Sequence, residues 1–245
     1  MKRLVLVLLF AVNGFSLNAN EFIHVVTEEL RPLNYLENNE VKGRSTAIVR
    51  QVLKEADLES SFQVFPWARS FAMAQNKKNT LIYTINRTPE REQKFKWIGL
   101  LDFNHYHSFL FKLKANDKVK ITNLEDAKSY VIGAQLGDVN YELLKSEGFK
   151  HIQAVPERSQ TVKMLLRNRV DLVVGSYAIL NEEFNKVGAE FELIEPLIPF
   201  KTSNPYMAIS NQTSDELVNK IKAAYQRLVL RGDIPSFETR VAAIK

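Results

Sequence analysis

The chain has 245 residues, of which 45% are hydrophobic and 25% are charged, a composition typical of a globular protein and not of a disordered one. It contains no cysteine, which excludes disulfides, zinc–thiolate sites, iron–sulfur clusters and cysteine nucleophiles. Lys and Arg outnumber Asp and Glu by 33 to 28 with no basic stripe, so the charge balance does not indicate a nucleic-acid partner.

The first twenty residues predict an export signal. Lys2 and Arg3 precede an apolar run, Leu4–Val12, and the small residue Ala19 offers a cleavage point. The run is too short to span a bilayer, and no cysteine follows it that could carry a lipid anchor. The alternative, a buried N-terminal element, leaves the Lys–Arg pair unexplained. We therefore expect residues 1–19 to be a cleaved signal peptide and the rest to be a soluble periplasmic protein, whose net charge is +3 instead of +5.

Strand-like runs alternate with helical patterns in the first half of the mature chain. Strands are predicted at Phe22–Thr27, Phe62–Phe65 and Thr80–Ile85. Helices are predicted behind Ser45 or Thr46 as N-cap and over Trp67–Asn76. A third helix start is predicted at Thr88-Pro89-Glu90, where a cap residue, a proline and an acid follow one another.

The second half repeats this alternation. Strands are predicted at Tyr130–Gly133, His151–Val155 and Leu172–Gly175, with helices capped by Asp138, Ser159 and Ser214. Two extended runs, Tyr106–Leu113 and Glu192–Ile209, interrupt this alternation of strands and helices. They favour a protein in which the chain passes twice between two lobes. The predicted fold class is α/β, with two hinged lobes that each hold a mostly parallel sheet flanked by helices. Residues 20–105 and 205–245 form lobe 1 in this prediction, and residues 106–204 form lobe 2.

Motifs of common secreted enzymes are absent from the sequence. It has no G-x-S-x-G elbow, no H-E-x-x-H helix, no S-x-x-K pair and no Gly-rich phosphate loop. His105 and His107 would share one face of a strand, and surface or hinge histidines without a third ligand are favoured there over a metal pair. We therefore expect a protein without catalytic activity, metal or cofactor.

One stretch, Leu81–Arg91, has the character of a binding site. A buried strand ends in the polar residues Thr84 and Asn86 and then enters a helix whose first turn carries Arg91. Parallel sheets bind ligands beyond the carboxyl ends of their strands, and helix N-termini favour anions. A guanidinium there can hold a carboxylate through two hydrogen bonds. An ordinary solvated arginine at a helix start is the alternative.

In its context this stretch resembles the family 3 extracellular solute-binding proteins, periplasmic receptors that hand amino acids and similar solutes to ABC importers. The resemblance rests on Thr88-Pro89-Glu90-Arg91 followed by Phe95-Lys96-Trp97. Weaker matches cover the mature chain, at Pro32–Tyr35, Val131–Gly137, Asn168–Leu172, Asn204–Ile209 and Arg231–Ile234. The resemblance implies a two-lobed periplasmic-binding-protein-like fold (type II) that closes over a small-molecule solute. We expect a monomer whose partner is a membrane permease complex or a membrane sensor.

The resemblance also implies roles for single residues. Arg91 occupies the position that holds the carboxylate of the ligand, with Thr84 and Asn86 on the strand beside it. Tyr35 and Trp67 lie near positions where aromatic rings flank the ligand. For Trp67, which has Arg69 two residues on, packing in the core is an equal alternative. The remaining candidate ligand-binding residues are Arg69, Arg87, Asp138 and Ser176.

Two of these candidates depart from the amino-acid receptors of the family. Ser176 stands where an aspartate usually accepts the ammonium group of the ligand, and Asp138 stands where hydroxyl residues usually help to bind its carboxylate. Asp138 would repel a carboxylate, and serves instead as a helix cap or as a partner for a cation. Arg87 adds a positive charge near the cleft. We therefore expect a small, polar, carboxylate-bearing solute, an amino acid or a related compound, whose ammonium group is held in another way.

Two alternatives to an import receptor stay open. Cyclohexadienyl and arogenate-type dehydratases resemble these receptors, and in such an enzyme Asp138 or Glu90 would have to supply the general acid. A solute sensor that docks on a membrane signalling protein would use the same cleft, and the sequence does not separate it from an import receptor.

Overall fold

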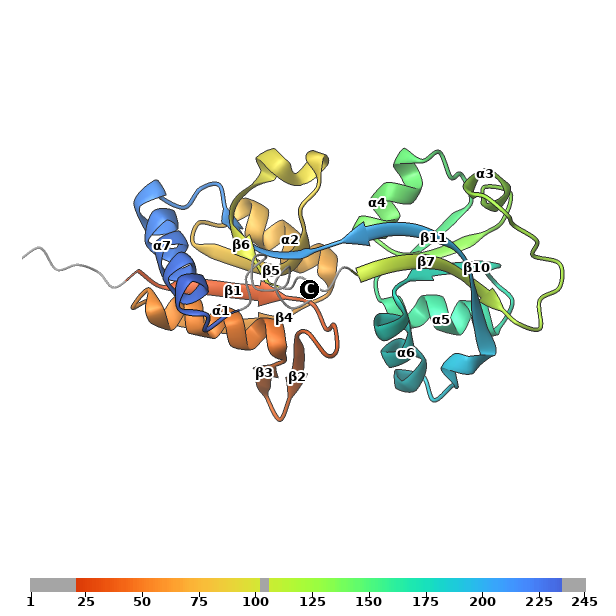
Figure 1. The fold of residues 1–245 in the computed structure, drawn as a ribbon, viewed down its shortest axis with the longest axis horizontal. Helices are drawn as coiled ribbons and strands as arrows, with labels where there is room; N and C mark the ends of the chain where they lie inside the picture. The colour runs from red at the N-terminus through yellow and green to blue at the C-terminus, as the bar shows by residue number, and fades with distance from the viewer. Residues whose placement is uncertain (1–20, 102–105, 235–245) are drawn as a thin grey trace, which may run out of the picture.

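Two five-stranded sheets, one in each lobe, organise the chain (Figure 1). The computed structural model describes residues 21–101 and 106–234. The strand order is β4-β1-β5-β12-β6 in the first sheet and β11-β7-β10-β8-β9 in the second, and helices flank both sheets. The predicted fold class, a two-lobed α/β protein with mostly parallel sheets, is confirmed.

The first lobe is built from both ends of the described chain. Its strands are β1 (Ile23–Thr27), β4 (Ser60–Val64), β5 (Thr80–Asn86), β6 (Phe95–Leu100) and β12 (Pro205–Ser210). Its helices are α1 (Arg44–Glu55), α2 (Trp67–Asn76) and α7 (Asp215–Arg231), with a short turn η1 (Pro89–Lys94) and a hairpin of β2 (Tyr35–Glu37) and β3 (Glu40–Lys42). β1 runs parallel to β4 and β5, whereas β12 runs antiparallel to both of its neighbours.

The second lobe is formed by the middle of the chain. Its strands are β7 (Tyr106–Leu113), β8 (Ile132–Gln135), β9 (Ile152–Val155), β10 (Leu172–Gly175) and β11 (Ile194–Ser203). Its helices are α3 (Leu124–Ala127), α4 (Val139–Ser146), α5 (Arg158–Leu166) and α6 (Tyr177–Lys186), followed by a turn η2 (Phe191–Leu193). β10, β8 and β9 are parallel, and β7 and β11 are antiparallel to each other.

The long strands β7 and β11 lead toward the first lobe side by side (Figure 1). Their pairing extends from Leu113 opposite Ile194 to Tyr106 opposite Ser203, and β12 then joins the first sheet. Residues 102–105, which include His105, lie outside the described residues. The exact lobe boundaries, at 105/106 and 204/205, stay a prediction.

The five-stranded sheet of the first lobe is buried on both faces, which explains its near-continuous apolar strands. Leu81 and Tyr83 of β5 belong to a core that contains Val49 of α1 and Ile221 of α7. Ile82 points to the other face, into a core that includes Trp67 of α2. The alternation of side chains along a strand therefore places α2 on one face and α1 with α7 on the other.

Most predicted elements are present, but two helix starts and the type of one helix differ. α1 begins after Gly43, so Ser45 and Thr46 lie buried in its first turn and are not caps. α5 begins at Arg158, one residue before the predicted cap Ser159. The predicted start is present at Thr88 and Pro89, but it opens only the 3-10 turn η1, because the chain re-enters the sheet in β6 directly after it. Helix α6 was not predicted.

An exposed ion-pair cluster ties the end of α1 to the end of α7. Arg227 Nε donates to Glu55 Oε1 at 2.6 Å, and Arg231 Nη2 donates to Glu55 Oε2 at 2.8 Å. These two hydrogen bonds lower the pKa of the Glu55 carboxyl from 4.5 to about 2. A carboxyl with a lowered pKa stabilises the fold above its unfolded-state pKa, and that stability is lost as the pH falls through its folded-state pKa.

We therefore predict a pH-dependent cost for Glu55→Gln. The wild-type protein should melt at a higher temperature than the variant at neutral pH, and the difference should shrink as the pH falls from about 4.5 to about 2. Thermal melts of both proteins at a series of pH values measure this difference. A difference that stays constant across that range would mean that Glu55 does not act through its charge.

Candidate functional site

A cavity lies between the lobes and is lined by residues from both of them. It has a volume of about 60 Å³, which is room for a few water molecules. Six of the nine predicted site residues line it, namely Trp67, Thr84, Asn86, Arg91, Asp138 and Ser176. A solute larger than a few waters can enter only if the lobes separate.

Thr84 reaches the cavity through a bulge in β5. The pairing of β5 with β12 shifts between Tyr206 and Met207, and Thr84 adopts the left-handed backbone conformation with φ of 59°. This conformation is unfavourable for a β-branched residue and is concentrated at functional sites. The Thr84 hydroxyl donates to Asn34 Oδ1 at 2.6 Å, and Asn34 Nδ2 donates to the backbone oxygen of Glu28 at 2.7 Å. These bonds hold the distorted strand end in place.

Arg91 crosses from the first lobe to the second. Its side chain is fully buried, and its Nε and Nη2 atoms both lie 2.9 Å from Glu142 Oε2 on α4. Nη2 also donates to the Gly137 carbonyl at 3.2 Å, and Nη1 donates to the backbone oxygen of Asn86 at 3.4 Å. Burial raises the pKa of the Glu142 carboxyl, and the charge of Arg91 opposes this shift. The guanidinium therefore holds a carboxylate of the opposite lobe.

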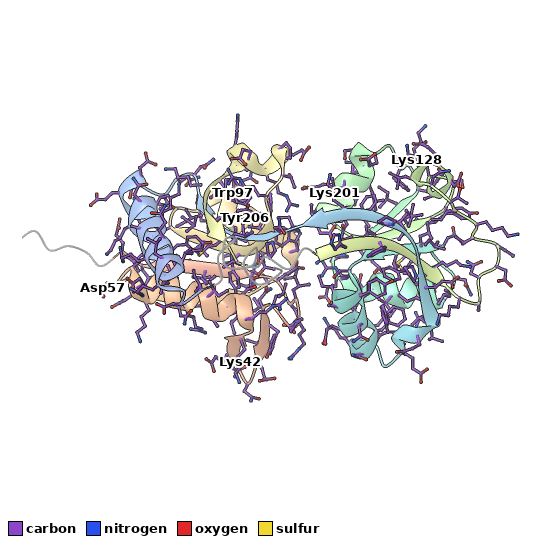
Figure 2. The ribbon with its side chains drawn as sticks, in the orientation of Figure 1. Lys42, Asp57, Trp97, Lys128, Lys201 and Tyr206 are labelled. Atoms are coloured by element: carbon purple, nitrogen blue, oxygen red, sulfur yellow. The ribbon has the colours of Figure 1, made fainter. Side chains whose placement is uncertain are left out.

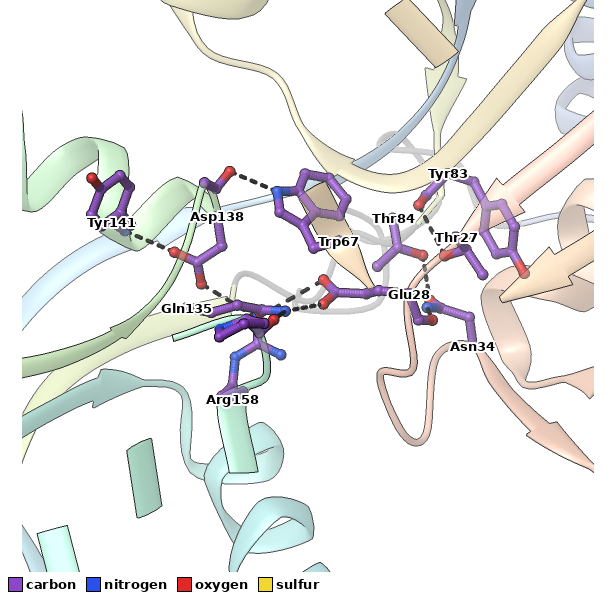
Figure 3. Close-up of polar contacts among 12 residues, drawn as sticks. Thr27, Glu28, Asn34, Trp67, Tyr83, Thr84, Gln135, Asp138, Tyr141 and Arg158 are labelled. Atoms are coloured by element: carbon purple, nitrogen blue, oxygen red, sulfur yellow. Dashed lines mark hydrogen bonds and ion pairs between the residues drawn. The ribbon is translucent and has the colours of Figure 1, made fainter. Parts of the chain in front are cut away.

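Trp67 forms a second contact between the lobes (Figure 3). Its indole Nε1 donates to the Gly137 carbonyl at 2.6 Å, so Trp67 and Arg91 converge on one backbone oxygen. The guanidinium of Arg91 lies 5.5 Å from the Trp67 ring and 5.3 Å from the Phe71 ring. The tryptophan is thus both part of a core and part of the cavity wall, and its place beside a ligand stays a prediction.

A third contact between the lobes is formed by Glu28, directly after β1. Gln135 Nε2 at the end of β8 donates to Glu28 Oε2 at 2.8 Å (Figure 3). Arg158 lies 3.9 Å from Glu28 Oε1 and donates to Asp138 Oδ2 at 3.3 Å. Burial raises the pKa of Glu28, while Arg158 and the hydrogen bond from Gln135 work against this rise. An arginine whose side chain is only 10% exposed thus lies between two buried carboxylates.

Asp138 and Ser176 both cap helices. The Asp138 carboxylate accepts from the backbone N–H of Tyr141 at 2.7 Å at the start of α4, and it also pairs with Arg158. Both alternatives for Asp138, a helix cap and a partner for a cation, are therefore realised within the chain. Ser176 Oγ accepts from the backbone N–H of Ile179 at 3.4 Å at the start of α6. Both side chains also line the cavity.

The structure does not bring the other three predicted residues into the cavity. Arg87 pairs with Glu92, with Nε donating to Oε2 at 2.7 Å. Tyr35 lies on the hairpin, where the guanidinium of Arg31 stacks on its ring at 3.9 Å. Arg69 is on the exposed side of α2 and stacks on the Phe65 ring at 4.0 Å.

The aromatic rings near Arg87 lie on the first lobe (Figure 2). Trp97 and Tyr206 meet edge to face with ring centroids 5.8 Å apart. The guanidinium of Arg87 is 5.4 Å from the Trp97 ring and 5.8 Å from the Tyr206 ring. Arg87 is thus held by neighbours of its own lobe.

Three residues with polar contacts where the lobes meet were not predicted from the sequence, namely Glu28, Glu142 and Arg158. Glu28 directly follows a predicted strand, which is where ligand-binding residues gather in parallel sheets. Arg158 is a cation in the first turn of a helix, a position that the helix dipole disfavours and that asks for a carboxylate partner. The place of Glu28 after a strand and the place of Arg158 at a helix start could therefore have identified these two residues from the sequence. Glu142 sits on a helix surface with no comparable signal.

The candidate acids for catalysis fit that role poorly. Asp138 is engaged by Tyr141 and Arg158, and Glu90 is exposed. A backbone hydrogen bond is the main cause of a lowered pKa of Glu90, which disfavours its protonated form. Within the described residues, no group of three His, Asp or Glu side chains is placed to hold a metal ion.

The profile of the bacterial extracellular solute-binding proteins, family 3, matches residues 23–240. The chain belongs to this family. The resemblance that the sequence motifs indicated is thereby confirmed. A search of curated proteins returned no relative of matching sequence. In the parts of the family protein that the structure describes, no helix has the length and apolar character needed to cross a bilayer.

Solved structures of low sequence identity share the fold of this family 3 protein. A histidine kinase sensor domain with similarity to periplasmic binding proteins gives a TM-score of 0.74 at 14% identity, covering 87% of this chain and 92% of that chain. The arginine-, lysine-, histidine-binding protein ArtJ from Geobacillus stearothermophilus gives 0.69 at 20% identity, with coverages of 87% and 91%. Holo ArgBP from T. maritima gives 0.69 at 14% identity, with coverages of 84% and 90%.

Proposed function

We propose that this protein is a periplasmic receptor that closes its two lobes over a small, polar, carboxylate-bearing solute, an amino acid or a related compound. Membership in the solute-binding family supports a small-molecule ligand. The similarity to ArtJ and to holo ArgBP supports an amino acid as the starting point for a ligand search.

The Arg91–Glu142 contact is the observation that carries this proposal. A buried guanidinium of one lobe already holds a carboxylate of the other lobe at 2.9 Å, and this guanidinium also lines the cavity between the lobes. A carboxylate of a solute has the same charge and the same two oxygens, so it can take the place of Glu142 on Arg91. Exchange of one carboxylate for the other would join the lobes through the solute.

An import complex or a membrane sensor would receive the closed receptor. The family is extracellular. Delivery of the solute to an ABC importer is the role that the resemblance of the sequence motifs to this family implies. The similarity to a histidine kinase sensor domain favours the second candidate, in which the receptor docks on a membrane signalling protein. Co-purification with a permease or with a sensor protein encoded next to this protein in the genome would separate the two roles.

A thermal-shift screen of the full chain tests the receptor proposal. The panel should contain amino acids, polyamines, small organic acids and short peptides, with calorimetry on every solute that raises the melting temperature. A ligand that binds the folded state raises stability by about 2.7 kcal/mol at 100 times its dissociation constant, so a binder is visible. A folded protein that no member of the panel stabilises would contradict the proposal.

A dehydratase would behave differently in the same preparation. An enzyme of this kind would convert prephenate or arogenate, and the absorbance of the product reports the reaction. We expect no turnover, because neither candidate acid is placed or tuned for proton transfer.

A further inference from the structure

A second chamber lies between the lobes next to the central cavity. We call it the Glu183 chamber, and it is lined by Glu28, Trp67, Gln135, Arg158 and Glu183. Glu28, Trp67 and Arg158 also line the central cavity, so the two spaces share one wall. The chamber has a volume of about 190 Å³, three times that of the central cavity. It therefore offers the larger space for part of a solute.

Three buried side-chain atoms of residues that line the chamber have no hydrogen-bond partner among the described residues. Two are acceptors, Gln135 Oε1 and Glu183 Oε2, whose residues are only 5% and 6% exposed, and the third is a donor, Arg158 Nη1. Buried polar atoms are nearly always paired, and an unpaired carboxylate oxygen is costly. The two acceptors require a donor, and Arg158 Nη1, which already faces Glu28 and Asp138, can take a further acceptor.

The charges around the chamber also favour a cation. Its lining includes four carboxylates, Glu28, Glu29, Glu157 and Glu183, against two cations, Arg158 and Lys186. Burial is the main cause of a raised pKa of Glu183, with Arg158 and Lys186 opposing it. A second cation brought close to Glu183 would compensate for the burial of its charge.

We propose that the Glu183 chamber binds a cationic N–H group of the solute, an ammonium or a guanidinium, which donates to Glu183 Oε2 and Gln135 Oε1. This inference rests on the proposed function and adds to it. The carboxylate of the solute would lie on Arg91 in the central cavity, and its cationic group would extend past Trp67 into the larger chamber.

The solute predicted in this way has a carboxylate at one end and a cation at the other. L-Arginine and L-citrulline are suitable matched probes, because they have similar size and differ in the charge of the terminal group. Calorimetry with the wild-type protein should give an affinity for arginine at least about tenfold higher than for citrulline, since a charged donor contributes more than a neutral one.

Glu183→Gln removes one charge with little change of shape. The variant should lose about 10- to 100-fold in arginine affinity and should change little toward citrulline. The matched control is Glu182→Gln, the adjacent residue on α6, which does not line the chamber. It should bind both probes like the wild type. Circular dichroism and a thermal melt show whether each variant is folded.

The outcomes separate this inference from the receptor proposal. Equal affinity of the wild-type protein for arginine and citrulline, or binding of neutral amino acids only, overturns the cation site and leaves the receptor intact. A Glu183→Gln variant that keeps full preference for arginine also overturns it. If no solute of the wider panel binds the wild-type protein, the receptor proposal and the cation site fail together. The wild-type comparison holds even if the variant does not fold.

Discussion

Replacing Arg91 with Gln is expected to abolish measurable solute binding. The guanidinium is fully buried where the lobes meet and already holds a carboxylate there through two nitrogen atoms. A hydrogen bond to a charged group contributes about 1.5–3 kcal/mol, so two such bonds correspond to about 3–6 kcal/mol. The dissociation constant measured by calorimetry should therefore rise by about 100-fold or more.

Arg87→Gln is the matched control for this experiment. Arg87 lies four residues earlier in the chain, pairs with Glu92 and does not line the cavity. Its loss should change affinity by no more than about twofold, because exposed ion pairs contribute little. An Arg91→Gln protein that is folded and binds with wild-type affinity would show that the solute is not held by Arg91.

The fold was largely predictable from sequence because the strands and helices of each lobe have local hydrophobic patterns. Apolar strand runs and amphipathic helices alternate, and the two extended runs mark the long pair β7 and β11. Helix ends were less predictable, since Gly43 is the N-cap of α1 although two residues with better capping side chains follow it. Packing of Thr46 against Tyr83, whose hydroxyl groups are 2.8 Å apart, overrides the capping preference there.

The candidate site was predictable only in part, for a physical reason. Arg91, Thr84 and Asn86 follow from a strand end that leads into a turn, which is a local pattern. Their partners come from the other lobe: Glu142 lies 51 residues after Arg91, and Gln135 lies 107 residues after Glu28. Periodicity has no information on contacts at such separations, so the pairing of Arg91 with a carboxylate of the chain could not be foreseen.

Glu142→Gln is expected to open the lobes of the solute-free protein. The variant leaves the Arg91 guanidinium without its carboxylate partner, and separation of the lobes lets water solvate it. The loss of a charge-assisted contact corresponds to about 1.5–3 kcal/mol, which shifts the balance between closed and open forms by about 10- to 100-fold. Small-angle X-ray scattering should report a larger radius of gyration than for the wild type.

The same variant should bind a carboxylate solute more tightly, because the solute no longer displaces a competing carboxylate from Arg91. Glu147→Gln is the matched control, since Glu147 is exposed directly after α4 and does not line the cavity. The two partners of one ion pair are therefore predicted to have effects of opposite sign on affinity. A purely structural ion pair would weaken binding from either side, so reduced affinity in Glu142→Gln would contradict the carboxylate exchange.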